Sequence, residues 1–427
     1  MPNSAVKQQY EELPYPPRNP ADEARRLVRT VGDDLVELNH HCFAGRRDFR
    51  RDFRCLVAGG GTGDSAIFLA EQLRDCNAEV VYLDLSEASR QVAEQRARVR
   101  GLTNIQWVTA SLLDLPQLGL GAFDYINCSG VLHHLPEPKD GLACLAGALR
   151  DGGALYVMLY ARYGRRGVYE LQEILRTLLP ADLPTLEKVK AARALLAQLP
   201  PTNYFERNRS RFETEMSPQG YGDAGLYDLL LHSQDRSYDV DAVYDLLGAS
   251  GLQLVGFTGP QKRMYRPEWL LRDMTALPSF AHLGPQQRYA VAERLSGDIT
   301  KHAFYANRGA DCTARLDDAS LCIVLTGEMK GMHEQLHQAI VPGQPLSITY
   351  TLDDKKEVLQ LPGNAINKEL FRYFDGQTSI EKMIRKVKLK AGNGNLLAIR
   401  SEIERAFELL HAYGWAYLAA ATVASQS

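Results

Sequence analysis

The chain has 427 residues, of which 45% are apolar and 24% charged, a balance typical of folded domains and not of a disordered chain. Its 49 Lys and Arg residues nearly cancel its 52 Asp and Glu residues, so the net charge of -3 provides no global attraction for nucleic acid or anionic lipid. No apolar run suggests a signal peptide or a membrane span, and none of the seven cysteines forms a CxxC pair. We therefore expect a cytoplasmic protein of about two to four domains, with reduced thiols and no membrane contact.

The first 50 residues are polar, and we predict that they form a helical N-terminal leader. The segment YPPRNP at 15–20 is typical of an extended or turn conformation, because each proline biases the preceding residue away from the helix. Apolar residues then recur near helical spacing over Ala21–Leu38, which predicts an amphipathic helix there.

From residue 53 onward, short apolar runs alternate with helical patterns. Strands are expected at 55–58, 79–85, 105–108, 123–129 and 154–160. This alternation predicts an α/β fold with a doubly wound, mostly parallel sheet, whose ligands bind at the carboxyl ends of the strands.

The alternation stops at residue 161 and resumes with a helix over 237–251 and a strand over 252–257. The run Leu321–Leu325 is expected to be the last strand of the same sheet. We therefore predict an α/β domain formed by 51–160 and 236–327, with a helix-prone insertion at 161–235.

A glycine-rich turn follows the first expected strand, with the sequence VAGGGTGD at 57–64. A dinucleotide-binding loop of the GxGxxG/A type would need a small residue at 64, where the carboxylate of Asp64 would repel a pyrophosphate. A P-loop is excluded, because no Gly-Lys-Ser/Thr follows. The remaining pattern, GxGxG at Gly59, Gly61 and Gly63, suits a ligand without phosphate groups.

On this loop and four further landmarks, the chain resembles the class I S-adenosylmethionine-dependent methyltransferases, and more narrowly the branch of the ubiquinone- and menaquinone-biosynthesis methyltransferases. The other landmarks are Asp84, which lies 21 residues beyond Gly63, and the segments ASLLDLP at 110–116, FDYINCSGVLHHL at 123–135 and RDGG at 150–153. The resemblance covers about residues 53–160, with a weaker match at 236–257. It implies a Rossmann-like fold, S-adenosyl-L-methionine as cofactor, and a cofactor site formed by Gly59, Gly61, Gly63, Asp64, Asp84, Leu85, Ser111, Leu112, Ser129 and Gly130.

The chain departs from the family at one position. The family usually has an acidic residue two positions before the first glycine, where it organises the loop and the amino-acid end of the cofactor, and this chain has Val57. We expect Asp64 to take over part of that duty.

Candidates for catalysis and for acceptor binding follow the fourth and fifth strands or lie in the insertion. His133 and His134 are adjacent, so we expect at most one of them to face a substrate and the pair to serve mainly the scaffold. His232 is a third candidate for a general base. A metal site built from His40, His41 or the pair at 133 and 134 lacks ligand spacing, so no metal is expected. We hypothesise that residues 161–235 form a lid over the acceptor. The candidates for acceptor contact are Tyr160, Tyr163, Asp223 and Asp235.

The last hundred residues, 328–427, are expected to form a separate accessory domain of the winged-helix-like α+β type. Strands are predicted at 346–352, 357–361 and 415–418, and two capping boxes, at Thr378–Glu381 and Ser401–Glu404, are each expected to open a helix. Basic residues between 382 and 390 are more typical of a solvated helix face than of a nucleic-acid site, so nucleic acid is disfavoured as a partner. Contact with a protein or peptide through 328–427 remains open.

Three hypotheses for the function follow. The first is methyl transfer to a small or medium organic molecule, which we favour. The second is methylation of a protein, peptide or tRNA docked by the C-terminal domain. The third is a non-catalytic, cofactor-binding regulator, for which Val57 is the only support. The sequence identifies neither the acceptor nor the atom that is methylated.

Overall fold

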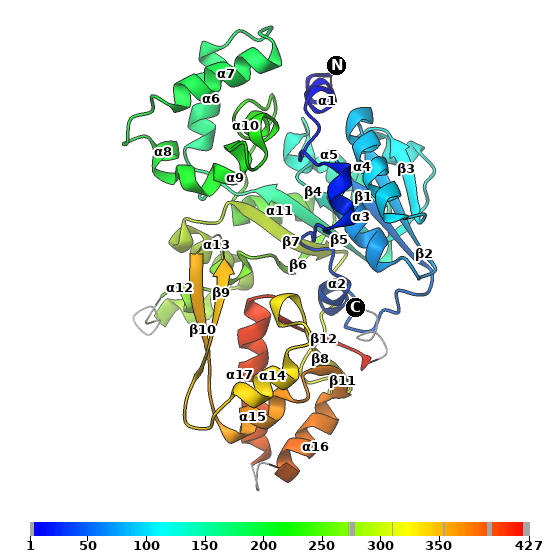
Figure 1. The fold of residues 1–427 in the computed structure, drawn as a ribbon, viewed down its shortest axis with the longest axis vertical. Helices are drawn as coiled ribbons and strands as arrows, with labels where there is room; N and C mark the ends of the chain where they lie inside the picture. The colour runs from blue at the N-terminus through cyan, green and yellow to red at the C-terminus, as the bar shows by residue number, and fades with distance from the viewer. Residues whose placement is uncertain are drawn as a thin grey trace.

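A computed structural model describes residues 4–271, 273, 278–309, 311–352, 355–390 and 395–421. A central sheet with flanking helices forms the middle of the molecule, a group of helices lies at one end, and a module built from the last hundred residues lies at the other (Figure 1). None of the described helices combines the length and the apolar character that crossing a membrane requires.

The central sheet has seven strands in the order β3-β2-β1-β4-β5-β7-β6, which confirms the predicted Rossmann-like architecture. The first five strands are parallel, and β7 runs antiparallel to both β5 and β6. Their bounds are β1 (Phe53–Ala58), β2 (Ala78–Asp84), β3 (Ile105–Thr109), β4 (Phe123–Ser129), β5 (Leu149–Tyr160), β6 (Gln253–Phe257) and β7 (Lys301–Asn307).

Both faces of this sheet are buried, which is why its strands are almost continuously apolar. Alternate residues of β1 enter two different cores, with Leu56 and Ala58 in one and Cys55 and Val57 in the other. The helices that belong to this part of the chain are α3 (Asp64–Gln72), α4 (Glu87–Arg100), α5 (Pro138–Gly147), α11 (Val240–Ala249), α12 (Pro267–Leu270) and α13 (Pro285–Ser296). Short 3-10 helices are η2 (Leu112–Gln117), η3 (Leu132–His134), η5 (Lys262–Tyr265) and η6 (Pro278–His282).

The predicted last strand of this sheet was wrong. Residues Cys322–Leu325 form β8, which pairs antiparallel with two C-terminal strands in a separate sheet. The seventh strand is instead β7, whose sequence KHAFYAN begins and ends with polar residues and therefore lacks an apolar-strand signature. The central sheet thus ends at Asn307, about twenty residues before the predicted boundary at 327.

The predicted helix over Ala21–Leu38 was also wrong. A 3-10 helix, η1 (Pro20–Ala24), is followed by an irregular segment and then by α2 (Leu35–Cys42), and α1 (Ser4–Glu12) precedes both. The helical pattern is interrupted at Gly32, whose φ is +85° and whose Cβ position would lie 2.3 Å from the Tyr156 ring. The carboxylate of Asp34 accepts the backbone N–H groups of Val36 and Glu37 and so sets the start of α2.

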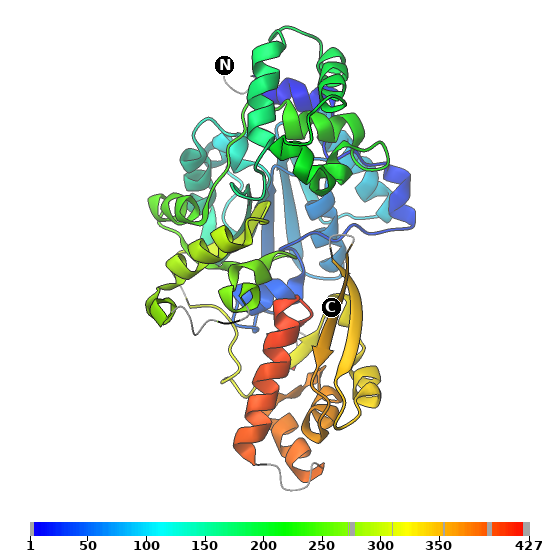
Figure 2. The ribbon, with the colours of Figure 1, turned by 90° about the vertical axis from the view of Figure 1, so that its left-hand side faces the viewer.

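Residues 161–235 form a helical insertion with an apolar core of its own, in which Val168, Phe205 and Leu226 are fully buried. Its helices are α6 (Val168–Leu178), α7 (Thr185–Leu196), α8 (Tyr204–Asn208), η4 (Arg209–Phe212), α9 (Glu213–Met216) and α10 (Gly222–Leu230). They lie on the side of the sheet where the parallel strands end, next to α1 (Figures 1 and 2).

The C-terminal module combines a three-stranded sheet, in the order β11-β8-β12, with a two-stranded hairpin, β9-β10. Its elements are β8, η7 (Gly327–Met329), α14 (His333–Ala339), β9 (Leu346–Leu352), β10 (Lys355–Leu361), α15 (Ala365–Phe371), β11 (Asp375–Ser379), α16 (Ile380–Lys390), α17 (Leu396–Ala412) and β12 (Ala416–Ala419). The capping box predicted at Ser401 was wrong, because Asn395 caps α17 and Ser401 lies inside that helix.

Candidate functional site

The glycine-rich turn joins β1 to α3 and has a backbone shape that other residues could hardly adopt. Gly59, Gly61 and Gly63 have φ values of +78°, +50° and +101°, in the region that favours glycine. A Cβ on Gly59 would lie 2.2 Å from a methyl group of Val131. The turn therefore brings its backbone N–H groups close to the carboxyl ends of the neighbouring strands.

Asp84 ends β2 next to this turn, as predicted, and its carboxylate holds the turn in place. It accepts the backbone N–H of Gly61 at 2.7 Å and that of Ser86 at 2.8 Å. Burial raises the pKa of Asp84 above its ordinary value, and these hydrogen bonds to the charged form oppose that effect.

A cavity of about 290 Å³ opens at this point, at the lower end of the usual size range for small-molecule sites. It is lined by all but one of the residues predicted to bind the cofactor, namely Gly59, Gly61, Asp64, Asp84, Leu85, Ser111, Leu112, Ser129 and Gly130. The exception is Gly63, whose Cβ position would lie 2.7 Å from the side chain of Ala93, so its role is the close packing of the turn on α4. A cavity with a glycine backbone at one wall and a carboxylate at the end of β2 fits a nucleoside without phosphate groups.

A second carboxylate, Asp33, is buried beside this cavity, and no motif in the sequence indicated it. It accepts hydrogen bonds from the Tyr125 hydroxyl and the Asn127 amide, both at 2.8 Å, and from the Thr30 hydroxyl at 2.5 Å. Burial raises the pKa of Asp33 to about 6, and these donors limit the increase. Two of these partners, Thr30 and Asn127, line the cavity, and Asn127 pairs with Val57 across the neighbouring strands, so Asp33 lies behind this wall.

The N-terminal segment predicted as a polar leader lies across the glycine turn instead. The Tyr15 carbonyl accepts the backbone N–H of Thr62 at 3.2 Å, and the Pro16 carbonyl accepts the Thr62 hydroxyl at 2.6 Å. Tyr10 of α1, Tyr15 and Pro16 all line the cavity. We call residues 4–24 the N-terminal strap, because they cover the cavity from outside the sheet.

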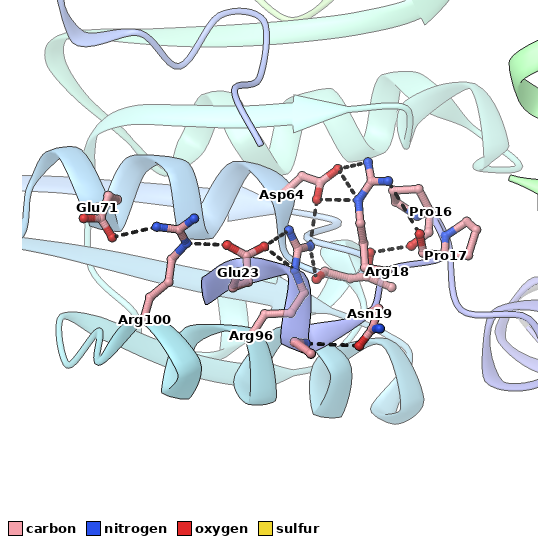
Figure 3. Close-up of polar contacts among 11 residues, drawn as sticks. Pro16, Pro17, Arg18, Asn19, Glu23, Asp64, Glu71, Arg96 and Arg100 are labelled. Atoms are coloured by element: carbon pink, nitrogen blue, oxygen red, sulfur yellow. Dashed lines mark hydrogen bonds and ion pairs between the residues drawn. The ribbon is translucent and has the colours of Figure 1, made fainter. Parts of the chain in front are cut away.

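A chain of ion pairs attaches the strap to α3 and α4 (Figure 3). Arg18 binds Asp64 at 2.6 Å, Arg96 binds Asp64 at 2.7 Å and Glu23 at 2.5 Å, and Arg100 also contacts Glu23. The side chains of Arg96 and Glu23 are only 1% and 2% exposed, so this connection is buried.

These ion pairs determine the charge state of Asp64 at the cavity. Burial alone would raise the pKa of Asp64, but the hydrogen bonds and charges of Arg18 and Arg96 outweigh it and hold the pKa below its ordinary value. Asp64 is thus an ionised carboxylate whose charge two arginines already balance. The expectation that it replaces the carboxylate missing at Val57 stays a prediction.

A second group of polar side chains lies at the opposite wall of the cavity, where η3 and β5 meet the insertion. Asp228 of α10 accepts the Tyr10 hydroxyl at 3.0 Å and the Tyr160 hydroxyl at 3.1 Å. The rings of His134 and His232 stack at 3.8 Å, and burial raises the pKa of Asp228. Three segments far apart in sequence thus converge on one buried carboxylate.

The two adjacent histidines have different surroundings. His134 lines the cavity, and its Nδ1 lies 2.7 Å from the Gln234 carbonyl oxygen, so that nitrogen carries a proton and donates. In the neutral ring, Nε2 of His134 then keeps the lone pair. His133 is fully buried, stacks on Tyr160 at 4.0 Å, and has no hydrogen-bond partner at either nitrogen. Burial and the neighbouring His134 lower the pKa of His133.

The predicted acceptor contacts divide between this site and other places. Tyr160 lines the cavity, and the buried carboxylate of Asp235 lies within 4.8 Å of ring nitrogens of His133 and His134 and 3.8 Å from Arg165. Tyr163 instead packs near Arg294, and Asp223 forms an exposed pair with Arg193 at 2.6 Å. Tyr10 and Asp228 do face the cavity, and no motif in the sequence indicated either of them.

Ligating atoms of His134, Asp228 and His232 lie within 4.8 Å of one another, a spacing that could suit a metal ion. Nδ1 of His232, however, accepts the backbone N–H of Gln234 at 3.0 Å. Neutral His232 then carries its proton on Nε2, which removes the lone pair that a metal would need. The hydrogen bonding thus favours a proton-handling group over a metal centre.

Residues 56–155 match the family model described as a methyltransferase domain. The chain is 34% identical over 258 residues to an uncharacterized protein of Synechococcus sp., over 60% of each chain. It is 33% identical over 112 residues to the tRNA 5-carboxymethoxyuridine methyltransferase of Escherichia coli strain K12, covering 26% of this chain and 41% of that one. It is 30% identical over 113 residues to the ubiquinone/menaquinone biosynthesis C-methyltransferase UbiE of Rhizobium meliloti, covering 26% and 43%. The chain therefore spans about 60% of the first relative and less than half of the other two.

Among solved structures, PKMT2 from Rickettsia typhi in complex with AdoHcy resembles the whole arrangement of this chain. The TM-score is 0.63 at 15% sequence identity, and the match covers 90% of this chain and 75% of that one. At this identity the likeness concerns the fold alone.

Proposed function

We propose a function for this chain from the premise that it carries a class I S-adenosylmethionine-dependent methyltransferase domain. In this proposal, the protein methylates a small or medium organic acceptor that is held between the sheet edge and the helical insertion. S-adenosylmethionine supplies a methyl group that its sulfonium already activates for displacement. The chain has to hold the cofactor, orient the acceptor and exclude water.

The residues that would hold the cofactor are those of the glycine turn and of the strand ends beside it. Asp84 offers a carboxylate to a ribose, and Ser111 and Leu112 line the wall that the family uses for adenine. Asp33 and Asn127 are the polar groups at the wall closest to Val57. We infer that they replace the acidic residue that the family has at that position.

One observation carries the proposal of catalysis, namely the orientation of His134. The Gln234 carbonyl fixes the proton of His134 on Nδ1, so that Nε2 can accept a proton from an acceptor O–H or N–H. Asp228 lies within reach of the same ring and would balance the positive charge that protonation creates. The strap and the insertion enclose this part of the cavity, and that enclosure supports a small acceptor more than a macromolecule.

The alternatives remain proposals as well. A tRNA methyltransferase is among the relatives, and the C-terminal module has the hairpin and paired helices of our winged-helix-like interpretation, so docking of a protein, peptide or tRNA there is the second candidate. The third, a non-catalytic regulator, rests on Val57. We also place the protein in the cytoplasm, which its seven unpaired cysteines support.

Radiolabelled S-adenosylmethionine incubated with protein and size-fractionated cell extract distinguishes these functions. We expect label in the small-molecule fraction. Label confined to RNA or protein would favour the second candidate, and cofactor binding without any transfer would favour the third.

His134→Asn then tests the proposed general base on the labelled fraction. We expect turnover to fall by roughly 100-fold or more, as for the loss of a general base, while the Kd for the cofactor stays unchanged. His282→Asn, at an exposed histidine, is the matched control. Unchanged turnover in His134→Asn would remove this residue from the mechanism.

A further inference from the structure

A second cavity, of about 190 Å³, lies at the junction between the central sheet and the C-terminal module. Three segments contribute its charged and imidazole side chains: α2 contributes His40 and His41, η5 and the residue after it contribute Lys262, Arg263 and Arg266, and α17 contributes His411. Figure 2 shows one end of α17 reaching the foot of the sheet at this place. The cavity shares no lining residue with the cofactor cavity.

Three cations line this cavity, and two of them have no ion-pair partner among the described residues. Neither Lys262 nor Arg266 has a carboxylate oxygen within 4.0 Å among the described residues, whereas the neighbouring Arg263 binds Glu357 at 2.7 Å. Lys262 contacts only the Tyr417 hydroxyl, at 3.4 Å, and the face of that ring. Both residues are only partly exposed, and a partly buried cation without a counter-charge is costly, so an anion would complete their surroundings.

The carboxylate of Glu37 could supply this counter-charge, but it already accepts two hydrogen bonds. Glu37 accepts the Tyr417 hydroxyl at 2.7 Å and the Thr258 hydroxyl. Burial lowers the pKa of Lys262 to about 8, and the charge of Glu37 only partly offsets that effect. The positive charge at the cavity is thus incompletely balanced.

The three histidines line the cavity without adding charge, but His411 offers it no donor, because its Nδ1 donates to the Ala416 carbonyl at 3.0 Å. Burial lowers the pKa of His40 to about 3 and lowers those of His41 and His411, so all three are neutral at pH 7. Nδ1 of His40 accepts the backbone N–H of Leu418 at 3.1 Å, so its proton is on Nε2. His41 is only 7% exposed, and its Nε2 has no hydrogen-bond partner within the described part of the chain. A buried nitrogen left unsatisfied beside a cavity indicates a ligand that completes it.

We propose that this junction cavity binds an oxyanion of the phosphate type, with Lys262 and Arg266 as the charged donors and His40 and His41 as neutral donors. A metal ion is a poorer occupant, because both cations would repel it and because His40 has already used the lone pair of Nδ1. The ligand can be free phosphate or a phosphate group on an organic molecule. The site is independent of methyl transfer, and by contacting α2, η5 and α17 together it would fasten the C-terminal module to the methyltransferase sheet.

Titration of the whole protein with inorganic phosphate, at constant ionic strength against sodium chloride, tests this site by calorimetry and by thermal unfolding. We expect saturable binding and a rising Tm in the wild type. Lys262→Met should weaken binding by at least about tenfold, because it removes a charge-assisted hydrogen bond. The matched control is Lys382→Met, at an exposed lysine of α16, which should bind as the wild type does.

If Lys262→Met does not fold, Arg266→Gln serves as the second variant, and it should also weaken phosphate binding at this site. Phenyl phosphate that binds more tightly than inorganic phosphate would show that the natural ligand carries its phosphate group on an organic body, and equal or weaker binding would indicate free phosphate. Two results would overturn the proposal. One is phosphate binding that is no better than chloride binding or is unchanged in both variants. The other is saturable Zn²⁺ binding that His411→Ala abolishes, with no binding of phosphate.

Discussion

Replacement of Arg96 by Met should release the N-terminal strap from the glycine turn. Arg96 is the buried link of the ion-pair chain, since it holds both Glu23 of η1 and Asp64 of α3 while its own side chain is 1% exposed. Methionine has a similar length and no charge, so the variant removes the ionic contacts while filling most of the space.

The expected loss of stability depends on the charges that lose Arg96 as a partner. Removing one partner of a buried ion pair costs about 3–5 kcal/mol, because the remaining charge is buried without compensation. Glu23 keeps Arg100 and Asp64 keeps Arg18, so we expect the lower end, about 3 kcal/mol. This corresponds to roughly 150-fold more frequent opening of the strap. Arg96→Met with Glu23→Gln should cost less than the single variant, since the buried Glu23 charge is removed and Arg100 still contacts Glu71 at 3.6 Å.

Hydrogen exchange of the segment 15–25, followed by mass spectrometry, measures this opening directly. The control is Arg294→Met, which breaks an ion pair with Asp241 whose side chains are 45% and 47% exposed. Such surface pairs contribute about 0–1 kcal/mol, so this variant should exchange almost as the wild type does. The amides of 15–25 in Arg96→Met could instead exchange at rates within about threefold of the wild type, which corresponds to a change of under about 1 kcal/mol in the free energy of opening. That result would show that the buried pairs do not hold the strap.

Three further variants test the cofactor site. Asp84→Asn should weaken cofactor binding by roughly 10- to 100-fold in calorimetry, because the charged acceptor for the ribose is lost; an unchanged Kd would exclude that role. Gly59→Ala should abolish cofactor binding with an unchanged circular dichroism spectrum, because its Cβ would lie 2.2 Å from Val131 at a φ of +78°. Gly119→Ala, also at positive φ but in open space, is its control, and cofactor binding by Gly59→Ala would contradict the tight fit. Asp33→Asn should flatten the pH dependence of stability between about pH 4 and 6. The folded-state pKa of Asp33 is raised from 3.8 to about 6, so the folded state binds this proton more tightly and loses roughly 3 kcal/mol as the pH rises through that window. Urea unfolding at pH 4 and 7 measures the loss, and an identical pH dependence in Asp33→Asn and the wild type would refute this account.

The sheet, and the convergence of the candidate cofactor residues on one cavity, could be predicted because they depend on local patterns. An apolar run that ends in GxGxG specifies a turn at the end of a strand, and the position of Asp84 at the end of the next parallel strand follows from the topology. Neither inference requires knowledge of what packs against the site from a distance.

The other half of the site could not be predicted, because its residues meet only in the folded chain. Tyr10 and Asp228 are 218 residues apart and share one hydrogen bond, and Asp33 reaches the cavity through contacts with Tyr125 and Asn127 on β4. Single polar residues without periodicity or motif carry no local signal. The same reason explains the error at β7, whose place in the sheet depends on its pairing with β5 and β6.

The strap places a physical constraint on any reaction at this site. The Tyr15 carbonyl lies 2.6 Å from the position that a Cβ on Gly61 would occupy, so the strap and the glycine turn are in direct contact. Tyr10, on the same strap, also donates to Asp228 at the wall where the acceptor would lie. One segment thus contacts both the cofactor wall and the acceptor wall, and its opening exposes both together. Cofactor exchange and acceptor access should therefore rise in parallel in Arg96→Met, while Asp84→Asn should change cofactor affinity without increasing exchange of the strap amides.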